Sequence, residues 1–115
     1  MRYFNDQEFN CPCCHTHKMQ PGLLEALDEA RKYAGTPFVL NSAYRCESHN
    51  EKVGGKKESA HRSGWAVDIR VRSSRERYLV IMGLTRAGFH RIGVADTFVH
   101  ADIDPEKPKQ VIWTY

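Results

Sequence analysis

The sequence contains no long hydrophobic run. Its first residues, Met1 to Asp6, include no apolar stretch of signal-peptide length, and no later segment reaches the roughly 20 apolar residues of a membrane-spanning helix. We therefore expect neither membrane insertion nor a secretion signal. A chain of this kind should stay in the cytoplasm, where it is made, unless another factor releases it.

Signs of nucleic-acid binding and of modular construction are absent as well. There is no block of like charge, no aromatic RNA-binding signature and no helix-turn-helix pattern, so we expect no nucleic-acid partner. The chain has neither internal repeats nor a linker, and its 115 residues are enough to bury one core. It is thus predicted to be one domain, residues 1–115, and a monomer.

Cysteine is sparse, and its four residues gather mainly near the N-terminus: Cys11, Cys13, Cys14 and Cys46. With His15 and His17 they could hold a structural metal, but the pattern meets no recognised ligand spacing, and two adjacent cysteines do not easily bind one ion. In a cytoplasmic chain the thiols should stay reduced. We therefore interpret them as packed thiols, with Cys46 close enough to Cys11 or Cys13 to oxidise after release.

The hydrophobic pattern that is present predicts an α+β domain with two main helices. Apolar residues recur at three- and four-residue intervals through 21–34, which indicates an amphipathic helix with Gly35 at its end. Ser73 and Glu76 form a capping box that opens a second helix, and this helix should run to about Ala87.

The remaining segments predict strands and one long loop. A capping box at Asn5 and Glu8 indicates a short helical turn. Residues 46–64 have little apolar periodicity and several glycines, so they are predicted to form a loop of functional importance. Five strands are expected: 38–41, 65–71, 89–94, 97–103 and 110–115.

Two of these strands carry polar residues that should face away from the core. In 65–71, β-branched residues alternate with polar ones, so Asp68 points off the sheet. The same alternation in 97–103 places His100 and Asp102 on the equivalent face. If the two strands are antiparallel neighbours, Asp68 and His100 meet.

A third polar residue joins them from the preceding loop. His61 lies seven residues before Asp68, and Gly64 between them permits a tight turn. Taken singly, each histidine would be an ordinary hydrogen-bonded residue. Two imidazoles and a carboxylate on one face, however, are the ligand set of a catalytic zinc site with one position left for water. The sequence therefore predicts one Zn²⁺ bound by His61, Asp68 and His100.

Three motifs then resemble a known family when they are taken in order: Asn41-Ser-Ala-Tyr-Arg45, His61-x-x-Gly64-x-Ala66-x-Asp68 and His100-x-Asp102. The chain resembles the M15 zinc peptidases, which include D-alanyl-D-alanine carboxypeptidases and phage L-alanyl-D-glutamate endopeptidases that cut peptidoglycan stem peptides. The resemblance covers nearly the whole chain and is closest to the small single-domain members. It implies a small antiparallel sheet that carries the zinc site, packed with the two main helices, as in D-Ala-D-Ala peptidases and hedgehog domains.

The resemblance also implies substrate contacts. The Tyr-Arg pair of the family lies beside the metal, which makes Tyr44 and Arg45 candidates here, and an arginine fork suits the free carboxylates of a stem peptide. The alternative for Arg45 is a structural salt bridge. Ser59 and Trp65 could line the pocket, although Trp65 could instead pack beneath the loop.

Catalysis by this family needs a carboxylate that moves the proton of the attacking water. Many relatives have it three residues before the last histidine, but that position is Thr97 in this chain, with Asp96 one step earlier. Asp102 shares the face of His100, and on that ground we favour Asp102 over Asp96. The alternative for either residue is to orient His100 through a hydrogen bond.

Two functions from different classes follow. The first is zinc-dependent hydrolysis of peptidoglycan stem peptides, by a carboxypeptidase or an endopeptidase. A wall-cutting enzyme without a secretion signal would fit a phage endolysin that acts on the wall after release. The second is a zinc-stabilised binding or structural domain, because the resembling fold also occurs in hedgehog signalling domains.

Overall fold

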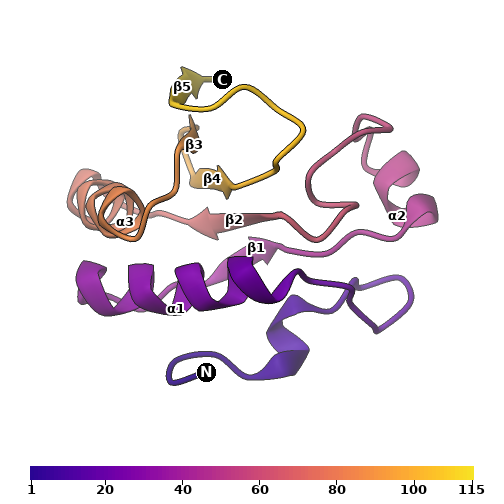
Figure 1. Ribbon diagram of the computed structural model, residues 1–115, viewed down its shortest axis with the longest axis horizontal. Helices are drawn as coiled ribbons and strands as arrows, with labels where there is room; N and C mark the ends of the chain where they lie inside the picture. Colours follow the sequence, from indigo (N-terminus) through magenta and orange to yellow (C-terminus); the bar gives the residue numbers. More distant parts are fainter.

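Five strands form one sheet in the order β1-β2-β4-β3-β5 (Figure 1). In the computed structural model, which describes residues 1–115, they are β1 (Leu40–Ser42), β2 (Ala66–Arg70), β3 (Arg91–Val94), β4 (Phe98–Asp102) and β5 (Val111–Thr114). All five were expected from the sequence. The first four strands pair antiparallel, whereas β5 runs parallel to β3.

The parallel edge differs from the antiparallel sheet that was expected. A tight turn joins β3 to β4, in which Ala95 N–H donates to the Phe98 carbonyl at 3.0 Å, so these strands must be antiparallel. Residues 103–110, by contrast, run back past the sheet before β5 begins on the far side of β3. The last strand therefore pairs with β3 and not with β4, as it would in a simple meander, and this makes the edge pair parallel.

The two main helices are α1 (Pro21–Ala34) and α3 (Ser74–Arg86), and both agree with the sequence analysis. Gly35 ends α1 in the left-handed conformation, with φ of 66°. Ser73 caps α3, and its hydroxyl accepts a hydrogen bond from Glu76 N–H at 3.1 Å. The turn near the N-terminus is a 3-10 helix, Asp6–Phe9.

One helix was not expected. The segment 46–64 was predicted to be a loop, but it begins with the short helix α2 (Glu47–Lys52), at the opposite end of the molecule from α3 (Figure 1). That prediction was wrong for these six residues. Asn50 is the only buried residue of α2, so the helix leaves no apolar periodicity in the sequence.

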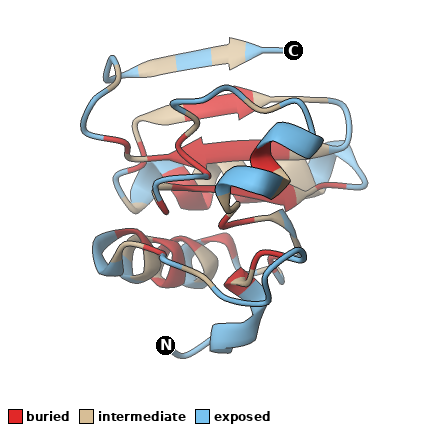
Figure 2. Ribbon diagram, turned by 90° about the vertical axis from the view of Figure 1, so that its right-hand side faces the viewer, coloured by how far each residue is buried: buried red, intermediate tan, exposed pale blue.

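The core lies between the helices and one face of the sheet. Alternate residues of β2 and β4 are fully buried there, and Figure 2 shows this burial concentrated in the central strands and the inner side of α1. The residues that pack in this layer are Leu23, Leu27, Ala30, Val67, Ile69, Val80, Leu84, Val99 and Ala101. The opposite face of β2 and β4 is left for polar side chains, as the alternation in the sequence predicts.

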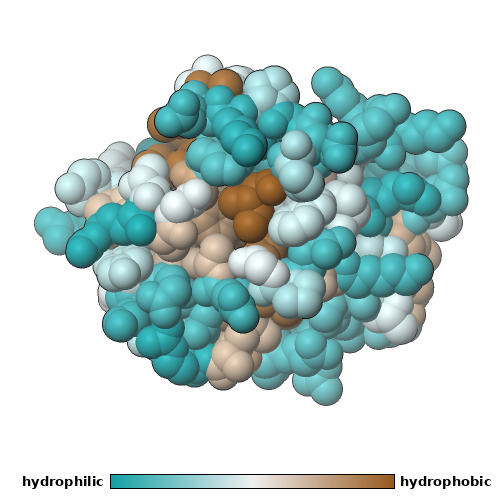
Figure 3. Space-filling view, in the orientation of Figure 1, coloured by the Kyte–Doolittle hydropathy of each residue, from teal (hydrophilic) through white to brown (hydrophobic).

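The surface away from the core is largely hydrophilic. In the view of Figure 3, polar residues cover most of the face, and strongly hydrophobic atoms show in a small area near its centre and at its upper edge. None of the helices combines the length and the apolar character that crossing a bilayer would require.

Helix α3 packs closely against α1. Gly83 of α3 faces α1 so closely that a Cβ atom there would collide with the carbonyl oxygen of Ala30 and come within 2.8 Å of Ala34 Cβ. Gly22, in the first turn of α1, has open space around the same position. The two helical glycines therefore differ in packing and not in secondary structure.

Gly83→Ala should lower the stability of the domain. Alanine favours a helix over glycine by about 1 kcal/mol, but an added methyl in a filled contact costs about 1–3 kcal/mol, so the net effect should be destabilising. Gly22→Ala is the matched control and should be neutral or slightly stabilising. Chemical denaturation of both variants tests this, and an equal gain in stability for both would refute the packing argument.

Candidate metal centre and its pocket

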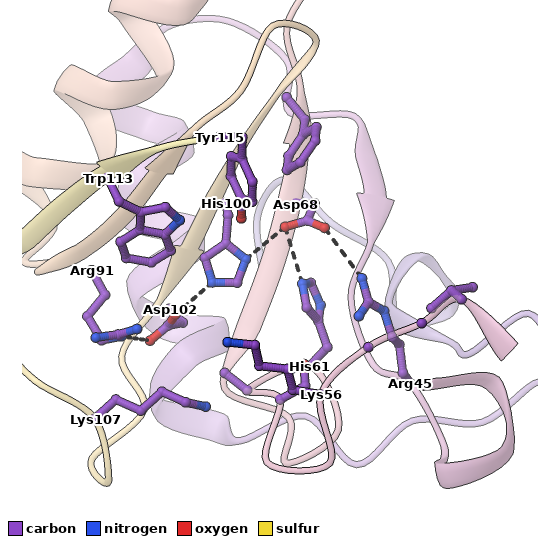
Figure 4. Close-up of a pocket in the computed structure, with 16 residues that line it drawn as sticks. Arg45, Lys56, His61, Asp68, Arg91, His100, Asp102, Lys107, Trp113 and Tyr115 are labelled. Atoms are coloured by element: carbon purple, nitrogen blue, oxygen red, sulfur yellow. Dashed lines mark hydrogen bonds and ion pairs between the residues drawn. The ribbon is translucent and has the colours of Figure 1, made fainter. Parts of the chain in front are cut away.

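A cavity of about 510 Å³ opens beside β2 and β4, on the face turned away from the core (Figure 4). The two strands pair so that Asp68 and His100 are direct cross-strand partners. Both side chains point into the cavity. The prediction that these residues meet on one face is therefore confirmed, together with the antiparallel pairing on which it depended.

His61 reaches the same point from the loop before β2. Its Nε2 lies 3.2 Å from Asp68 Oδ1, and His100 Nδ1 lies 2.9 Å from that same oxygen. The donor atoms of all three residues fall within 4.8 Å of one another. The turn that delivers His61 includes Gly64 at φ of 81°, where a side chain would collide with the carbonyl oxygen of Lys18.

Each imidazole also has an acceptor at its other nitrogen. His61 Nδ1 lies 2.8 Å from the carbonyl oxygen of Ala43, and His100 Nε2 lies 2.6 Å from Asp102 Oδ2. A neutral imidazole has only one N–H, so it cannot donate in both directions. A metal ion between His61 Nε2 and His100 Nδ1 would satisfy both rings. The other nitrogen of each ring would then keep its N–H and donate to Ala43 or Asp102. These residues therefore fit a metal ion.

The charges in the site favour ionised carboxylates. Burial opposes ionisation of Asp68, but hydrogen bonds from His100 and His61 outweigh it and hold the pKa of Asp68 well below its usual range. Burial likewise lowers the pKa of His100, but Asp102 and Asp68 outweigh it and raise that pKa above its usual value. Two imidazoles around an anionic carboxylate make a nitrogen and oxygen donor set that suits zinc.

Asp102 does not have a free oxygen for proton transfer. It is 1% exposed, and while Oδ2 faces His100, Oδ1 accepts from Arg91 Nε at 2.7 Å and from Asp104 N–H at 3.2 Å. Side-chain alternation along the strand predicted the face of Asp102 correctly. The contacts of Asp102, however, match the alternative role of orienting His100. These contacts favour the positioning role over the general base that strand alternation suggested.

Asp96 lies outside the pocket. It is exposed in the turn between β3 and β4 and borders a separate hollow with Arg70 and Arg77. Its backbone oxygen accepts from Arg77 Nη2 at 2.7 Å. The structure therefore does not bring the second candidate base to the metal ligands, because the turn carries its side chain past the end of the strand.

Arg45 points into the pocket, as expected. Its Nη2 lies 3.7 Å from Asp68 Oδ2, and its Nε donates to Ser42 Oγ at 3.2 Å. Ser59 also lines the pocket, with its hydroxyl accepting from His61 N–H at 3.2 Å. Arg45 is therefore placed both to orient Asp68 and to meet a substrate.

Two other expected pocket residues lie elsewhere. Tyr44 is buried in the core and does not line the pocket, which corrects its assignment as a substrate contact. Arg45, the next residue, lines the cavity, so the two side chains lie on different sides of the chain. Trp65 packs against the core beneath the loop, which was the alternative for that residue.

Residues 2–102 match the family model described as Peptidase M15. The chain belongs to the peptidase M15 family. The family resemblance carried by the three sequence motifs is thereby confirmed, and the matched range includes His61, Asp68 and His100. A search of curated proteins finds no match.

This M15 peptidase adds a further wall to the pocket from beyond the matched residues. The Trp113 indole of β5 lies over Gly93, where a Cβ would come within 2.6 Å of its Nε1, and reaches a ring distance of 5.5 Å from His100. Tyr115 follows it into the pocket (Figure 4). The sequence analysis missed both as pocket residues, because only the parallel pairing of β5 with β3 brings them there.

Basic side chains complete the M15 pocket. Its lining includes four cationic residues against the two carboxylates of Asp68 and Asp102: Arg45, Lys56, Arg91 and Lys107. Of these four, only Arg45 was singled out in the sequence, by the family motif. Three of these cations already form ion pairs, with Asp68, Asp102 and Asp104, so the pocket keeps a small excess of positive charge that favours an anionic group.

Proposed function

We propose that this M15 peptidase uses one Zn²⁺, held by His61, Asp68 and His100, to hydrolyse peptide bonds in peptidoglycan stem peptides. The observation that carries the proposal is the approach of one nitrogen from each imidazole to the same oxygen of Asp68. When bound, zinc brings the pKa of a water toward about 7 and polarises the scissile carbonyl.

Hydrogen bonds from neighbouring residues fix the orientation of the two histidine rings. Ala43 accepts from His61 and Asp102 accepts from His100, so each ring presents its remaining nitrogen to the pocket. Arg91 in turn fixes Asp102 from the neighbouring strand. Asp102 is therefore proposed as a positioning residue, whose negative charge keeps the proton of His100 on Nε2.

The substrate class follows from the charge of the pocket. Stem peptides carry free carboxylates on their D-residues, and Arg45 offers a planar fork of donors to such a group. Lys56 lines the same pocket and forms no salt bridge. Either a D-Ala-D-Ala bond or an L-Ala-D-Glu bond is compatible with this arrangement.

Mass spectrometry of purified muropeptides incubated with the zinc-loaded protein tests the proposal. We expect a product that has lost D-alanine or a stem peptide released after L-alanine, and neither product after treatment with a chelator. Addition of zinc to the chelated protein should restore the product. Intact muropeptides in the presence of bound zinc would contradict peptidase action on this substrate.

A second candidate is a zinc-stabilised binding domain, and one observation favours it. Both oxygens of Asp102 are engaged, and the only other carboxylate that lines the pocket is the candidate ligand Asp68. Such a site could hold a peptide without moving a proton. Calorimetry would then show muropeptide binding with no product in the mass spectrum.

The contribution of Arg45 to substrate recognition can be measured separately. Arg45→Lys keeps the charge but loses the bidentate geometry, so it should lower kcat/KM on stem peptides by about 10-fold or more while zinc content stays unchanged. Arg62→Lys is the matched control, because Arg62 pairs with Glu47 outside the pocket; its kcat/KM should not change.

Blocking the carboxylate of the substrate as an amide should weaken the unaltered protein by a similar factor. The two losses should not add when they are combined, since both remove the same contact. Fully additive losses would place the carboxylate against a different residue.

A further inference from the structure

The N-terminal loop brings three cysteine sulfurs together at a second place in the fold, away from the pocket. Cys11, Cys14 and Cys46 offer sulfur atoms that all lie within 4.8 Å of one another. Cys11 is fully buried, Cys46 is half-buried, and Cys14 is exposed. The expectation that Cys46 lies close to Cys11 is confirmed.

The loop that carries Cys11 and Cys14 has a fixed conformation. Cys11 N–H donates to the Thr16 carbonyl at 2.8 Å, and His15 N–H donates back to the Cys11 carbonyl at 2.8 Å. His15, just after Cys14, is held at φ of 58°, a conformation that residues other than glycine adopt rarely. The tight turn therefore places two cysteines separated by two residues on the same side of the loop.

This separation is half of a common zinc-binding pattern. Cys11-x-x-Cys14 was missed in the sequence because Cys13 lies between them and masks the spacing. The structure leaves Cys13 out of the converging group, which agrees with the argument that adjacent cysteines do not both bind one ion. Cys46, from the segment before α2, supplies the third sulfur.

The distance between the sulfurs is compatible with a metal site and too long for a disulfide. Cys11 Sγ and Cys46 Sγ are 3.7 Å apart. Two thiolates on one tetrahedral zinc, each about 2.3 Å from the ion, lie about 3.8 Å apart, whereas a disulfide requires about 2.05 Å. The observed spacing fits the edge of a zinc tetrahedron without movement of the backbone.

Helix α2 begins at the third cysteine of this group. His49 N–H donates to Cys46 Sγ at 3.4 Å at the start of α2. Cys46 is thus the N-cap residue of α2, and its sulfur accepts from the helix backbone.

We propose that Cys11, Cys14 and Cys46 form a second, structural zinc site, with its fourth position taken by solvent. Binding releases the three thiol protons to solvent and leaves three Zn–S bonds. The site ties the N-terminal loop to the segment 43–46, which holds His61 through the Ala43 carbonyl and carries Arg45. Its role is to fix that segment, whether or not the pocket cuts a peptide.

Cobalt substitution separates the two metal sites. Thiolate ligands give Co²⁺ a strong near-ultraviolet charge-transfer band, and the pocket ligands His61, Asp68 and His100 include no thiolate. Under reducing conditions the unaltered protein should bind two equivalents of Co²⁺ and show the band. Native mass spectrometry with Zn²⁺ should give the same count.

Single substitutions show which site binds each equivalent of Co²⁺. Cys14→Ser, at an exposed position that should not disturb folding, should lose one equivalent together with most of the band. His100→Ala should lose the other equivalent and keep the band, and Cys13→Ser should keep both equivalents. Chelation should lower the thermal unfolding midpoint of His100→Ala but not that of a Cys14→Ser, His100→Ala double variant.

The outcomes are distinct. A reduced protein that binds metal without the band, or a Cys13→Ser variant that alone loses the second equivalent, would overturn the proposed site. So would a Cys11–Cys46 disulfide that persists in the reduced, zinc-supplemented protein. One equivalent with the band, unchanged by His100→Ala, would support the cysteine site and count against metal in the pocket.

Discussion

Alanine in place of His61, Asp68 or His100 should remove the metal from the pocket and reduce peptide hydrolysis to the uncatalysed background. Three protein ligands are the usual minimum for a catalytic zinc site, so the loss of any one leaves a site too weak to retain the ion. Asp68→Ala should be the most severe, because both imidazoles and Arg45 contact this carboxylate.

His90→Ala is the matched control for the two histidine variants. His90 lies beside β5 in a different hollow and contributes nothing to the pocket. Metal analysis, stem-peptide hydrolysis and circular dichroism of each variant would separate loss of metal from loss of fold. Retention of pocket zinc in all three ligand variants would refute the assignment.

Asp102→Asn should weaken zinc binding and lower turnover together. Asparagine keeps the shape of the side chain but removes the charge that holds the Nε2 proton of His100 and pairs with Arg91. Loss of such an orienting carboxylate typically costs about 10- to 100-fold in metal affinity or activity. Asp96→Asn, in the exposed turn outside the pocket, should change neither quantity.

The two readouts distinguish positioning from proton transfer by Asp102. A positioning residue changes the zinc dissociation constant, and saturation with zinc should recover part of the lost turnover. A general base would leave zinc affinity intact and lower turnover by about 10²-fold or more at saturating zinc. The second pattern would restore Asp102 to the role that sequence parity favoured.

The central part of the site was predictable because strand alternation is local. Burial of one face of β2 and β4 requires Asp68 and His100 to lie on the other, and only their pairing had to be assumed. Tyr44 and Arg45 lie beyond the end of β1, so this local rule does not extend to them.

The remaining features of the site and fold depend on contacts between distant segments, which no local sequence pattern predicts. Strand alternation predicted the face on which Asp102 lies but not the residues that it contacts. Arg91 comes from β3, which pairs with β4 on the side opposite to β2. The place of Trp113 depends on how residues 103–110 cross the sheet. The short helix α2 buries one polar residue and therefore leaves no hydrophobic signal.

Anomalous diffraction from crystals of the zinc-loaded protein, measured above and below the zinc edge, tests the central claim most directly. We expect a peak within about 2.0–2.2 Å of His61 Nε2, an oxygen of Asp68 and His100 Nδ1. No peak among these three residues in crystals grown with excess zinc, or a peak only at the cysteines, would contradict a metal centre in the pocket.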